Sequence, residues 1–376
     1  MSASLFEPLQ LGDIALANRI VMAPMTRSRA GEGGLPTGLH QAYYAQRAGA
    51  GLIVAEGTYP SRHGKGYCRT PGIENTAQIY AWRDVTGSVR SRGAAMVLQL
   101  MHVGRVATRH NKAPDAQTVA PSAIRARGTI YADGQGLVEM EVPRALAENE
   151  VTAVIDEYRQ AAVNALAAGF DGVELHCSSG YLPMQFLLLC TNQRTDGYGG
   201  SLRARLRFVV ETLEAIAGAI GAGRVGLRIC PGNPYNDMHD DDPAATYGAL
   251  LDAVTPLGLA YLHVSRSPDP ALDAFALARR HFGGALIVND GFDGASAARA
   301  VASGVGEAVS FARHFIANPD LPQRLRHGAP LAAFDRTLLH TPGARGYTDY
   351  PAYEAYEAAA GLAATGQVIS QEGLQP

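Results

Sequence analysis

Short apolar runs alternate with longer amphipathic segments along most of this chain. In segment 151–168, apolar side chains recur at positions 151, 154, 155, 158, 161, 162 and 165, which is the spacing of one helical face. The same pattern predicts helices at 37–48, 76–90, 202–220, 244–254, 272–281 and 295–301. Between them lie runs that are apolar throughout, as expected of strands buried on both faces. These predicted strands are 19–26, 51–55, 95–100, 172–175, 225–229, 260–264, 285–288 and 308–311.

Eight such strands alternating with helices predict an α/β fold, specifically a (β/α)8 TIM barrel. A doubly wound open sheet is the alternative, but no Gly-x-Gly-x-x-Gly follows an early strand. The turn-rich residues 5–17 predict an N-terminal hairpin. Residues 105–143, after the third strand, are too long for an ordinary βα loop, so we expect a capping insertion there. We expect residues 1–366 to form one barrel domain and residues 367–376 to be a disordered tail.

The overall composition narrows the class of protein. The 376 residues are 47% hydrophobic and 18% charged, as in ordinary soluble enzymes. The net charge of −3 gives no indication of a nucleic-acid partner. The four cysteines have no zinc-binding spacing, and we expect no metal site. Without a signal-like N-terminus or an apolar run of about 18 residues, the chain is expected to be cytoplasmic, with no membrane partner.

Polar side chains crowd together just after the fourth predicted strand. His176, Cys177, Ser178, Ser179 and Tyr181 follow it within a few positions. The carboxyl ends of barrel strands carry the ligand-binding loops, so this cluster predicts an active site. A single histidine or tyrosine would more often be structural; the cluster makes a site the better interpretation.

A second group follows the last two predicted strands. Asn289, Asp290 and Gly291 come after one strand, and Ala312 and Arg313 after the other. Backbone N–H groups and a guanidinium at this place of a barrel are typical of phosphate binding. A surface salt bridge is the alternative role for Arg313. With no metal spacing and no Gly-x-Ser-x-Gly, the pattern indicates a bound phosphorylated cofactor.

Seven motifs occur in an order that points to one family. They include NRIVMAPMTR at 18–27, KGY at 65–67, QLMHVGR at 99–105 and NQRTDGYGGS at 192–201; the others are at 173–186, 315–320 and 346–351. Over nearly its whole length the chain resembles the Old Yellow Enzyme family of FMN-dependent ene-reductases. That resemblance implies hydride transfer from NADPH or NADH, through FMN, to the β-carbon of an electron-poor alkene such as an enone or nitroalkene.

The resemblance also implies which residues bind the cofactor. The Thr26 hydroxyl is expected to donate to the flavin O4, and Arg228 to lie near N1 and the C2 carbonyl. Tyr347 is expected near the dimethylbenzene end. The full set of implied cofactor-binding residues is Ala23, Pro24, Met25, Thr26, Gly57, Gln99, Arg228, Asp290, Gly291, Ala312, Arg313 and Tyr347.

The substrate is implied to lie over the flavin. His176 is expected to donate to the carbonyl or nitro oxygen, and Tyr181 to protonate Cα. The implied substrate-binding residues are His176, Ser179, Tyr67, Met101, Tyr235 and Asn236. The partners are then a small-molecule alkene and, at most, a second copy of the chain, giving a monomer or homodimer.

Three departures from the family pattern shape the functional alternatives. Ser179 replaces the usual His or Asn anchor, Met101 replaces a common Trp, and Asp290 and Ala312 replace glycines. The first departure predicts weaker substrate anchoring. It also leaves two alternatives: a flavin desaturase or biosynthetic oxidase with an atypical anchor, and a non-catalytic flavin-binding protein. Retention of both His176 and Tyr181 argues against the latter.

Overall fold

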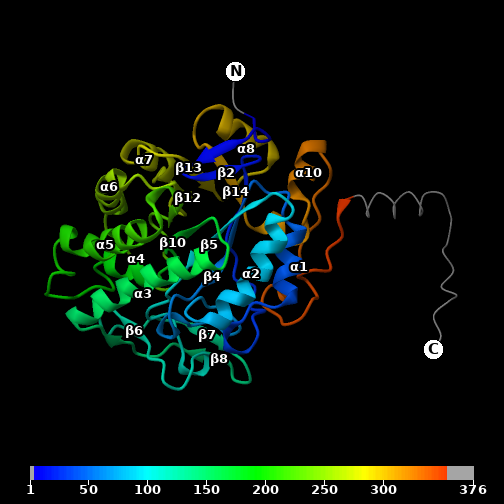
Figure 1. The fold of residues 1–376 in the computed structure, drawn as a ribbon. Helices are drawn as coiled ribbons and strands as arrows, with labels where there is room; N and C mark the ends of the chain where they lie inside the picture. Colours follow the sequence, from blue (N-terminus) through cyan, green and yellow to red (C-terminus); the bar gives the residue numbers. More distant parts are fainter. Residues whose placement is uncertain (1–3, 354–376) are drawn as a thin grey trace, which may run out of the picture.

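The computed structural model describes residues 4–353, and a ring of parallel strands forms its centre (Figure 1). The predicted tail at 367–376 lies outside the described residues, as does the end of the predicted 1–366 domain. The barrel strands are β3 (Ile20–Met22), β4 (Leu52–Thr58), β5 (Ala95–Leu100), β10 (Gly172–Cys177), β11 (Val225–Ile229), β12 (Tyr261–Ser265), β13 (Leu286–Asn289) and β14 (Ala308–Phe311).

The strands close into a barrel in chain order. Each pairs in parallel with the next, and β14 pairs with β3, with Val309 opposite Ile20. The predicted (β/α)8 barrel is therefore confirmed, and the doubly wound alternative is wrong. Two strands end three or four residues from the predicted position. The first strand stops at Met22, before Pro24, which has no N–H to donate to a ladder. The second continues to Thr58 across an irregularity after Ala55.

The helices that surround the barrel match the predicted segments closely. They are α1 (Gly38–Gln46), α2 (Thr76–Arg90), α3 (Glu148–Ala167), α5 (Leu202–Ile220), α6 (Pro243–Val254), α7 (Ala274–His281) and α8 (Gly294–Ala302). The seven predicted apolar positions of α3 are all among its buried residues. Local sequence also determines where individual helices begin and end. At the start of α2, the Asn75 side chain accepts a hydrogen bond from the Gln78 N–H. At the end of α5, Gly221 has a φ of 89° and terminates the helix.

Three short helices and several single turns were not predicted. The helices are α4 (Leu182–Leu187), α9 (Arg313–Ala317) and α10 (Leu321–His327). The 3-10 turns are η1 (Glu32–Gly34), η2 (Arg62–Gly64), η3 (Arg109–Asn111), η4 (Ala222–Arg224), η5 (Thr255–Leu257) and η6 (Arg336–Leu338).

The N-terminal hairpin closes one end of the barrel. Strands β1 (Leu9–Leu11) and β2 (Ile14–Leu16) pair antiparallel, as predicted. Leu11, Ile14 and Leu16 pack in one apolar cluster with the residues that begin the barrel strands, among them Leu52 and Ala308. This end is therefore filled, and the opposite, carboxyl end of the strands is left for ligands.

The segment between β5 and α3 lies over that opposite end. It contains β6 (Val119–Ala120), the antiparallel pair β7 (Thr129–Ala132) and β8 (Gly136–Glu139), and β9 (Arg144–Ala145). Ile130 and Met140 of this segment belong to the same buried apolar cluster as Met101 and Tyr181. Residues 105–143 thus pack directly against the predicted active-site tyrosine. Within residues 4–353, no helix is long and apolar enough to cross a membrane.

Candidate active site

A buried polar network lies inside the barrel, near the carboxyl ends of its strands. Glu174 of β10 accepts a hydrogen bond from Gln99 Nε2 (2.8 Å) and contacts Nδ1 of His263 (2.8 Å). The Arg228 guanidinium lies against the His263 ring, with Nη1 2.6 Å from Nε2. Its other nitrogen, Nη2, donates to Asn289 Oδ1 at 2.9 Å. Partners on β12 and β13 therefore hold Arg228 in one orientation, and Glu174 of β10 supports them through His263.

The charges in this network compensate each other. Burial would raise the pKa of Glu174, but His263 and Arg228 hold it below its usual value. Burial, and then the charge of Arg228, lowers the pKa of His263 to about 4, so its ring is neutral at physiological pH. Glu174 is therefore ionised and offsets the positive charge of Arg228. The guanidinium of Arg228 is half-buried and fixed at the mouth of the barrel.

A second cluster, at the end of β10, contains the predicted catalytic residues. The rings of His176 and Tyr181 meet edge to face, with centroids 4.9 Å apart. The phenol oxygen of Tyr181 lies 3.1 Å from that of Tyr67, and Ser178 Oγ lies 3.2 Å from His176 Nδ1. The structure thus brings together His176, Tyr181 and Tyr67, and adds Ser178.

Burial sets the protonation states of this cluster. It lowers the pKa of His176 to about 3, with Arg228 contributing further, so the imidazole is neutral. It raises the pKa of Tyr181 well above its usual range and that of Tyr67 to about 12. Both phenols therefore carry their protons at neutral pH.

A tight turn places Ser179 beside the cluster. Ser179 and Gly180 both have left-handed backbones, at φ 57° and 75°. A Cβ at Gly180 would lie 2.9 Å from the Cβ of Asn236, so the turn requires glycine there. The Ser179 carbonyl accepts the Asn236 amide at 2.8 Å, and its hydroxyl is 3.4 Å from that of Ser178. Ser178, and not Ser179, contacts His176.

Part of this cluster borders a cavity of about 700 Å³, whose lining does not include His176, Ser178 or Ser179. Tyr67, Tyr181, Tyr235, Asn236 and Thr26 line it, as do residues of the β7–β8 hairpin and of segment 336–342. Met101 is buried behind the wall: a Cβ on Gly57 would lie 2.5 Å from its sulfur. Gly57 and Met101 are therefore in close contact.

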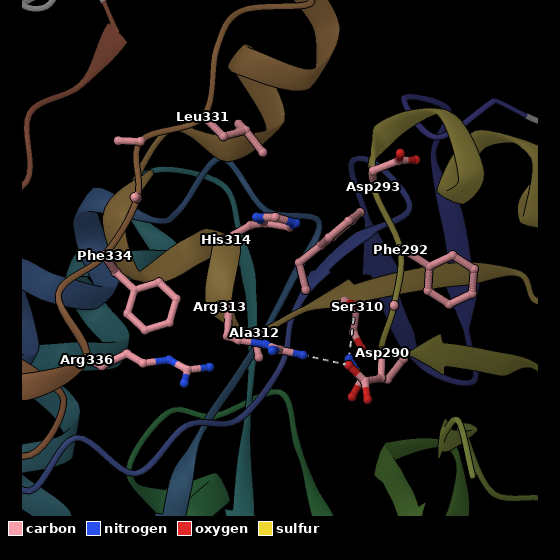
Figure 2. A pocket seen from close by; sticks show the side chains of 15 residues that line it. Asp290, Phe292, Asp293, Ser310, Ala312, Arg313, His314, Leu331, Phe334 and Arg336 are labelled. Atoms are coloured by element: carbon pink, nitrogen blue, oxygen red, sulfur yellow. Dashed lines mark hydrogen bonds and ion pairs between the residues drawn. The ribbon is translucent and has the colours of Figure 1, made fainter. Parts of the chain in front are cut away.

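A separate cleft of about 700 Å³ lies at the ends of β13 and β14 (Figure 2). Its walls include the predicted phosphate residues Asp290, Gly291, Ala312 and Arg313. Arg313 Nη2 donates to Asp290 Oδ1 at 3.1 Å, and both side chains are more than half exposed. The residues after the last two strands thus form one cleft, in which the arginine is already paired with a carboxylate.

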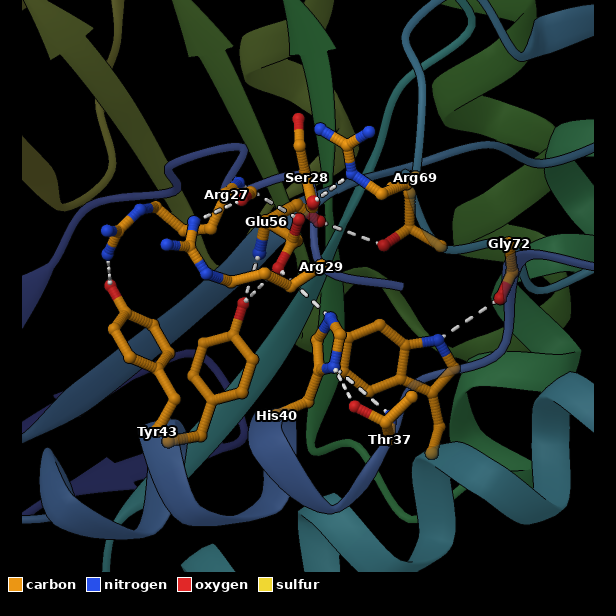
Figure 3. A network of polar contacts seen from close by, with 12 residues as sticks. Arg27, Ser28, Arg29, Thr37, His40, Tyr43, Glu56, Arg69 and Gly72 are labelled. Atoms are coloured by element: carbon orange, nitrogen blue, oxygen red, sulfur yellow. Dashed lines mark hydrogen bonds and ion pairs between the residues drawn. The ribbon is translucent and has the colours of Figure 1, made fainter. Parts of the chain in front are cut away.

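Seven of the predicted cofactor residues are not among the lining residues of either cavity: Ala23, Pro24, Met25, Gly57, Gln99, Arg228 and Tyr347. Ala23 and Tyr347 have no exposed surface. Tyr347 stacks on Tyr43, with centroids 4.0 Å apart, and the guanidinium groups of Arg27 and Arg29 lie over its ring. Tyr43, Arg27 and Arg29 belong to a buried polar network beside β4 (Figure 3). In this structure Tyr347 packs beneath the site and presents no surface to a ligand.

The remaining groups fit the parts of a flavin mononucleotide. Gln99 and the fixed cation Arg228 are suited to the polar edge of the ring, and the cleft beside Arg313 is suited to the phosphate. Among the described residues, no group of three or more His, Cys, Asp or Glu side chains could hold a metal ion. The fold and site therefore define a barrel enzyme that binds a phosphorylated redox cofactor.

Comparison with known proteins specifies the family. The model of the NADH:flavin oxidoreductase / NADH oxidase family matches residues 4–332. The chain belongs to this group, the Old Yellow Enzyme family. It is thus a flavin-dependent oxidoreductase that uses FMN and a reduced nicotinamide, as the sequence predicted.

Several relatives match over nearly their whole length. A probable flavin mononucleotide-dependent alkene reductase from Leishmania infantum is 39% identical, with 92% of this chain and 97% of the relative covered. 12-oxophytodienoate reductase 1 from Oryza sativa subsp. japonica is 39% identical, with 93% of each covered. Among solved structures, morphinone reductase superposes with a TM-score of 0.90 at 40% identity, covering 94% of this chain and 97% of that one.

Sequence reasoning missed some residues of the site. Glu174 and His263 were taken simply as parts of apolar strands, yet they hold Arg228 and Gln99 in place. A signal was present, because a lone ionisable residue inside an otherwise apolar buried strand requires a partner. Ser178 was noticed only as one polar residue among several; its contact with His176 depends on the turn geometry.

Proposed function

We propose that this protein is an ene-reductase that reduces electron-poor alkenes, such as enones or nitroalkenes, with hydride from NADPH or NADH. Relatives named alkene reductase, 12-oxophytodienoate reductase and morphinone reductase support this reaction. The observation that carries it is the edge-to-face contact of His176 and Tyr181 beside the cavity. The first can hold the electron-withdrawing oxygen of the substrate as a hydrogen-bond donor, and the second can protonate the α-carbon of the double bond.

The proposed cofactor site uses nine of the twelve predicted residues and leaves out Ala23, Asp290 and Tyr347. Pro24, Met25, Thr26 and Gly57 would line the ring, Gln99 and Arg228 its polar edge, and Gly291, Ala312 and Arg313 the phosphate. Held by these residues, FMN would supply hydride transfer from the reduced nicotinamide to the alkene β-carbon.

His176 is proposed to hold the electron-withdrawing oxygen of the substrate. Its low pKa keeps the ring neutral. One ring nitrogen therefore carries a proton and donates a hydrogen bond, and the other nitrogen accepts a hydrogen bond. In the proposed tautomer the Ser178 hydroxyl donates to Nδ1, which leaves the N–H on Nε2 for the substrate. This N–H stabilises the negative charge that develops on the oxygen as hydride arrives.

Tyr181 is proposed to protonate the alkene α-carbon. The phenol is protonated at neutral pH, because burial raises its pKa. As the proton leaves, the Tyr67 hydroxyl at 3.1 Å can donate to the developing phenolate. Cys177 is a poor alternative donor, because its side chain has no exposed surface.

Stopped-flow kinetics of the holoenzyme test this proposal. Anaerobic reduction by NADPH or NADH should bleach the flavin, and mixing the reduced enzyme with a cyclic enone should restore its colour. Reoxidation by oxygen alone, with no response to enones or nitroalkenes, would favour the desaturase or oxidase alternative. The proposal also retains a cytoplasmic monomer or homodimer, which size-exclusion chromatography and cell fractionation can test.

A further inference from the structure

Arg336 lies on the walls of both cavities described above. It begins η6, in the segment 336–347 that follows α10, hereafter the C-terminal strap. Figure 2 shows its side chain directed into the same hollow as Arg313. Within residues 4–353, the Arg336 guanidinium makes no hydrogen bond or ion pair. An unpaired cation therefore faces a cleft whose other arginine is already paired.

The carboxylates of the cleft explain why a second cation matters. Arg313 is paired with Asp290. Asp293, also on the wall, accepts the N–H and hydroxyl of Ser296 at the start of α8. These three charges sum to −1 before any ligand binds. Arg266 donates to the Asp290 carbonyl but is not on the cleft wall, so Arg336 is the wall residue that supplies the further cation needed by a phosphate of about −1.5 to −2 charge.

The backbone of the strap is firmly held, which fixes where Arg336 emerges. Arg29 donates to the carbonyls of Leu338 and Leu339, each at 2.9 Å, and to that of Arg345 at 3.0 Å. Arg27 donates to the carbonyl of Gly346 at 2.7 Å. A side chain on so well-anchored a segment loses less conformational freedom on binding than one on a loose loop.

We propose that Arg336 binds the FMN phosphate from the C-terminal strap and offsets the charge of Asp290. This inference rests on the flavin site of the proposed function. The phosphate then lies between Arg313, from the end of the barrel, and Arg336, from the strap. Thr337 and His340 of the strap also line the cavity beside Tyr181. Phosphate binding and one wall of the substrate cavity therefore depend on the same segment.

The test compares FMN with riboflavin, which lacks the phosphate. The FMN dissociation constant is obtained from the flavin fluorescence released on diluting the holoenzyme, and displacement by riboflavin gives the ratio of the two constants. Arg336→Gln should reduce the preference for FMN over riboflavin on the order of tenfold. Arg345→Gln is the matched control, because Arg345 is exposed on the same strap but lines neither cavity. It should leave the preference unchanged.

Asp290→Asn provides a second, opposite measurement. Removing the carboxylate should increase the preference for FMN, in the wild type and in Arg336→Gln alike. The inference is overturned if Arg336→Gln keeps the wild-type preference, including the case in which only the KM for the enone changes. Such a KM change would mean that Arg336 faces the substrate. Since the preference is a binding measurement, it can succeed or fail independently of whether the enzyme reduces enones.

Discussion

The phenol oxygens of Tyr67 and Tyr181 lie 3.1 Å apart, although the two residues come from opposite sides of the cavity mouth. Tyr67 follows η2, whereas Tyr181 immediately precedes α4. The two rings meet nearly at right angles, with their hydroxyls within hydrogen-bonding distance. Tyr67 is therefore the side chain best placed to support proton donation by Tyr181.

Tyr181→Phe should separate the two half-reactions. Flavin reduction by nicotinamide should be nearly unchanged, because the ring and its packing remain. Reoxidation by an enone should slow by about 10²–10⁴-fold, the usual cost of losing a general acid. Stopped-flow absorbance of the flavin measures both rates. Tyr67→Phe is the control and should slow reoxidation less, since the proton donor is retained. Equal reoxidation rates in Tyr181→Phe and the wild type would exclude Tyr181 as the donor.

The low pKa of His176 predicts a flat pH profile. A histidine with a pKa of about 3 stays neutral as the pH changes between about 5.5 and 8.5, so its donor N–H is present throughout. The rate of enone-driven reoxidation should then vary little over this range. A transition with a midpoint near pH 6.5 that disappears in His176→Asn would show that the ring titrates normally.

The barrel could be predicted from sequence because each strand and helix carries its own local pattern. Strand 95–100 and helix 202–220 were predicted with the observed bounds. α4 was missed for a physical reason: all six of its residues are buried, so it has no polar face and no helical periodicity to detect. α9 has only five residues, too few to display a repeat.

The site could be predicted in part. Family motifs indicated His176, Tyr181 and Arg313, and the structure places the first two in contact. The pairing of Arg313 with Asp290 and the inward direction of Arg336 depend on how distant loops fold together. No pattern within either loop reveals them. Likewise, Tyr347 was assigned to the flavin by its motif, but its surface is taken up by Tyr43 and two arginines.

Ser179→His tests whether the missing anchor limits turnover. The left-handed backbone at φ 57° is tolerated by histidine better than by most residues, so the substitution need not disturb the turn. A second imidazole beside His176 would provide another donor to the substrate oxygen. Loss of such a donor raises the activation free energy by about 2.7–4 kcal/mol in favourable sites, so a clear increase in turnover of a simple cyclic enone is expected.

Ser178→His, at the position that contacts His176, is the contrasting variant and should reduce turnover. An unchanged or lower rate in Ser179→His, at equal flavin content, would contradict the lost-anchor hypothesis.

Glu56→Gln should change how stability depends on pH. Glu56 has no exposed surface, and burial raises its pKa to about 7, although the backbone N–H of Arg27, 3.2 Å from Oε2, opposes the shift. The folded-state pKa is thus above the unfolded value of 4.5. Folding therefore favours the neutral carboxyl, and this contribution to stability is complete below about pH 4.5 and is lost as the pH rises through 7.

Glutamine cannot ionise, so Glu56→Gln should gain stability relative to the wild type as the pH rises from about 5 to 7, by no more than about 3 kcal/mol. Above about pH 7.5 the difference should stay constant. The measurement is the free energy of unfolding in urea, with the holoenzyme, at several pH values; Glu32→Gln, an exposed carboxyl in the preceding loop, is the matched control. Any fixed cost of exchanging an oxygen for an amide shifts the whole curve and leaves its shape unchanged. A difference between Glu56→Gln and the wild type that is the same at pH 5 and pH 7 would show that Glu56 is already ionised in the folded protein at pH 5, held by Arg27 and its neighbours.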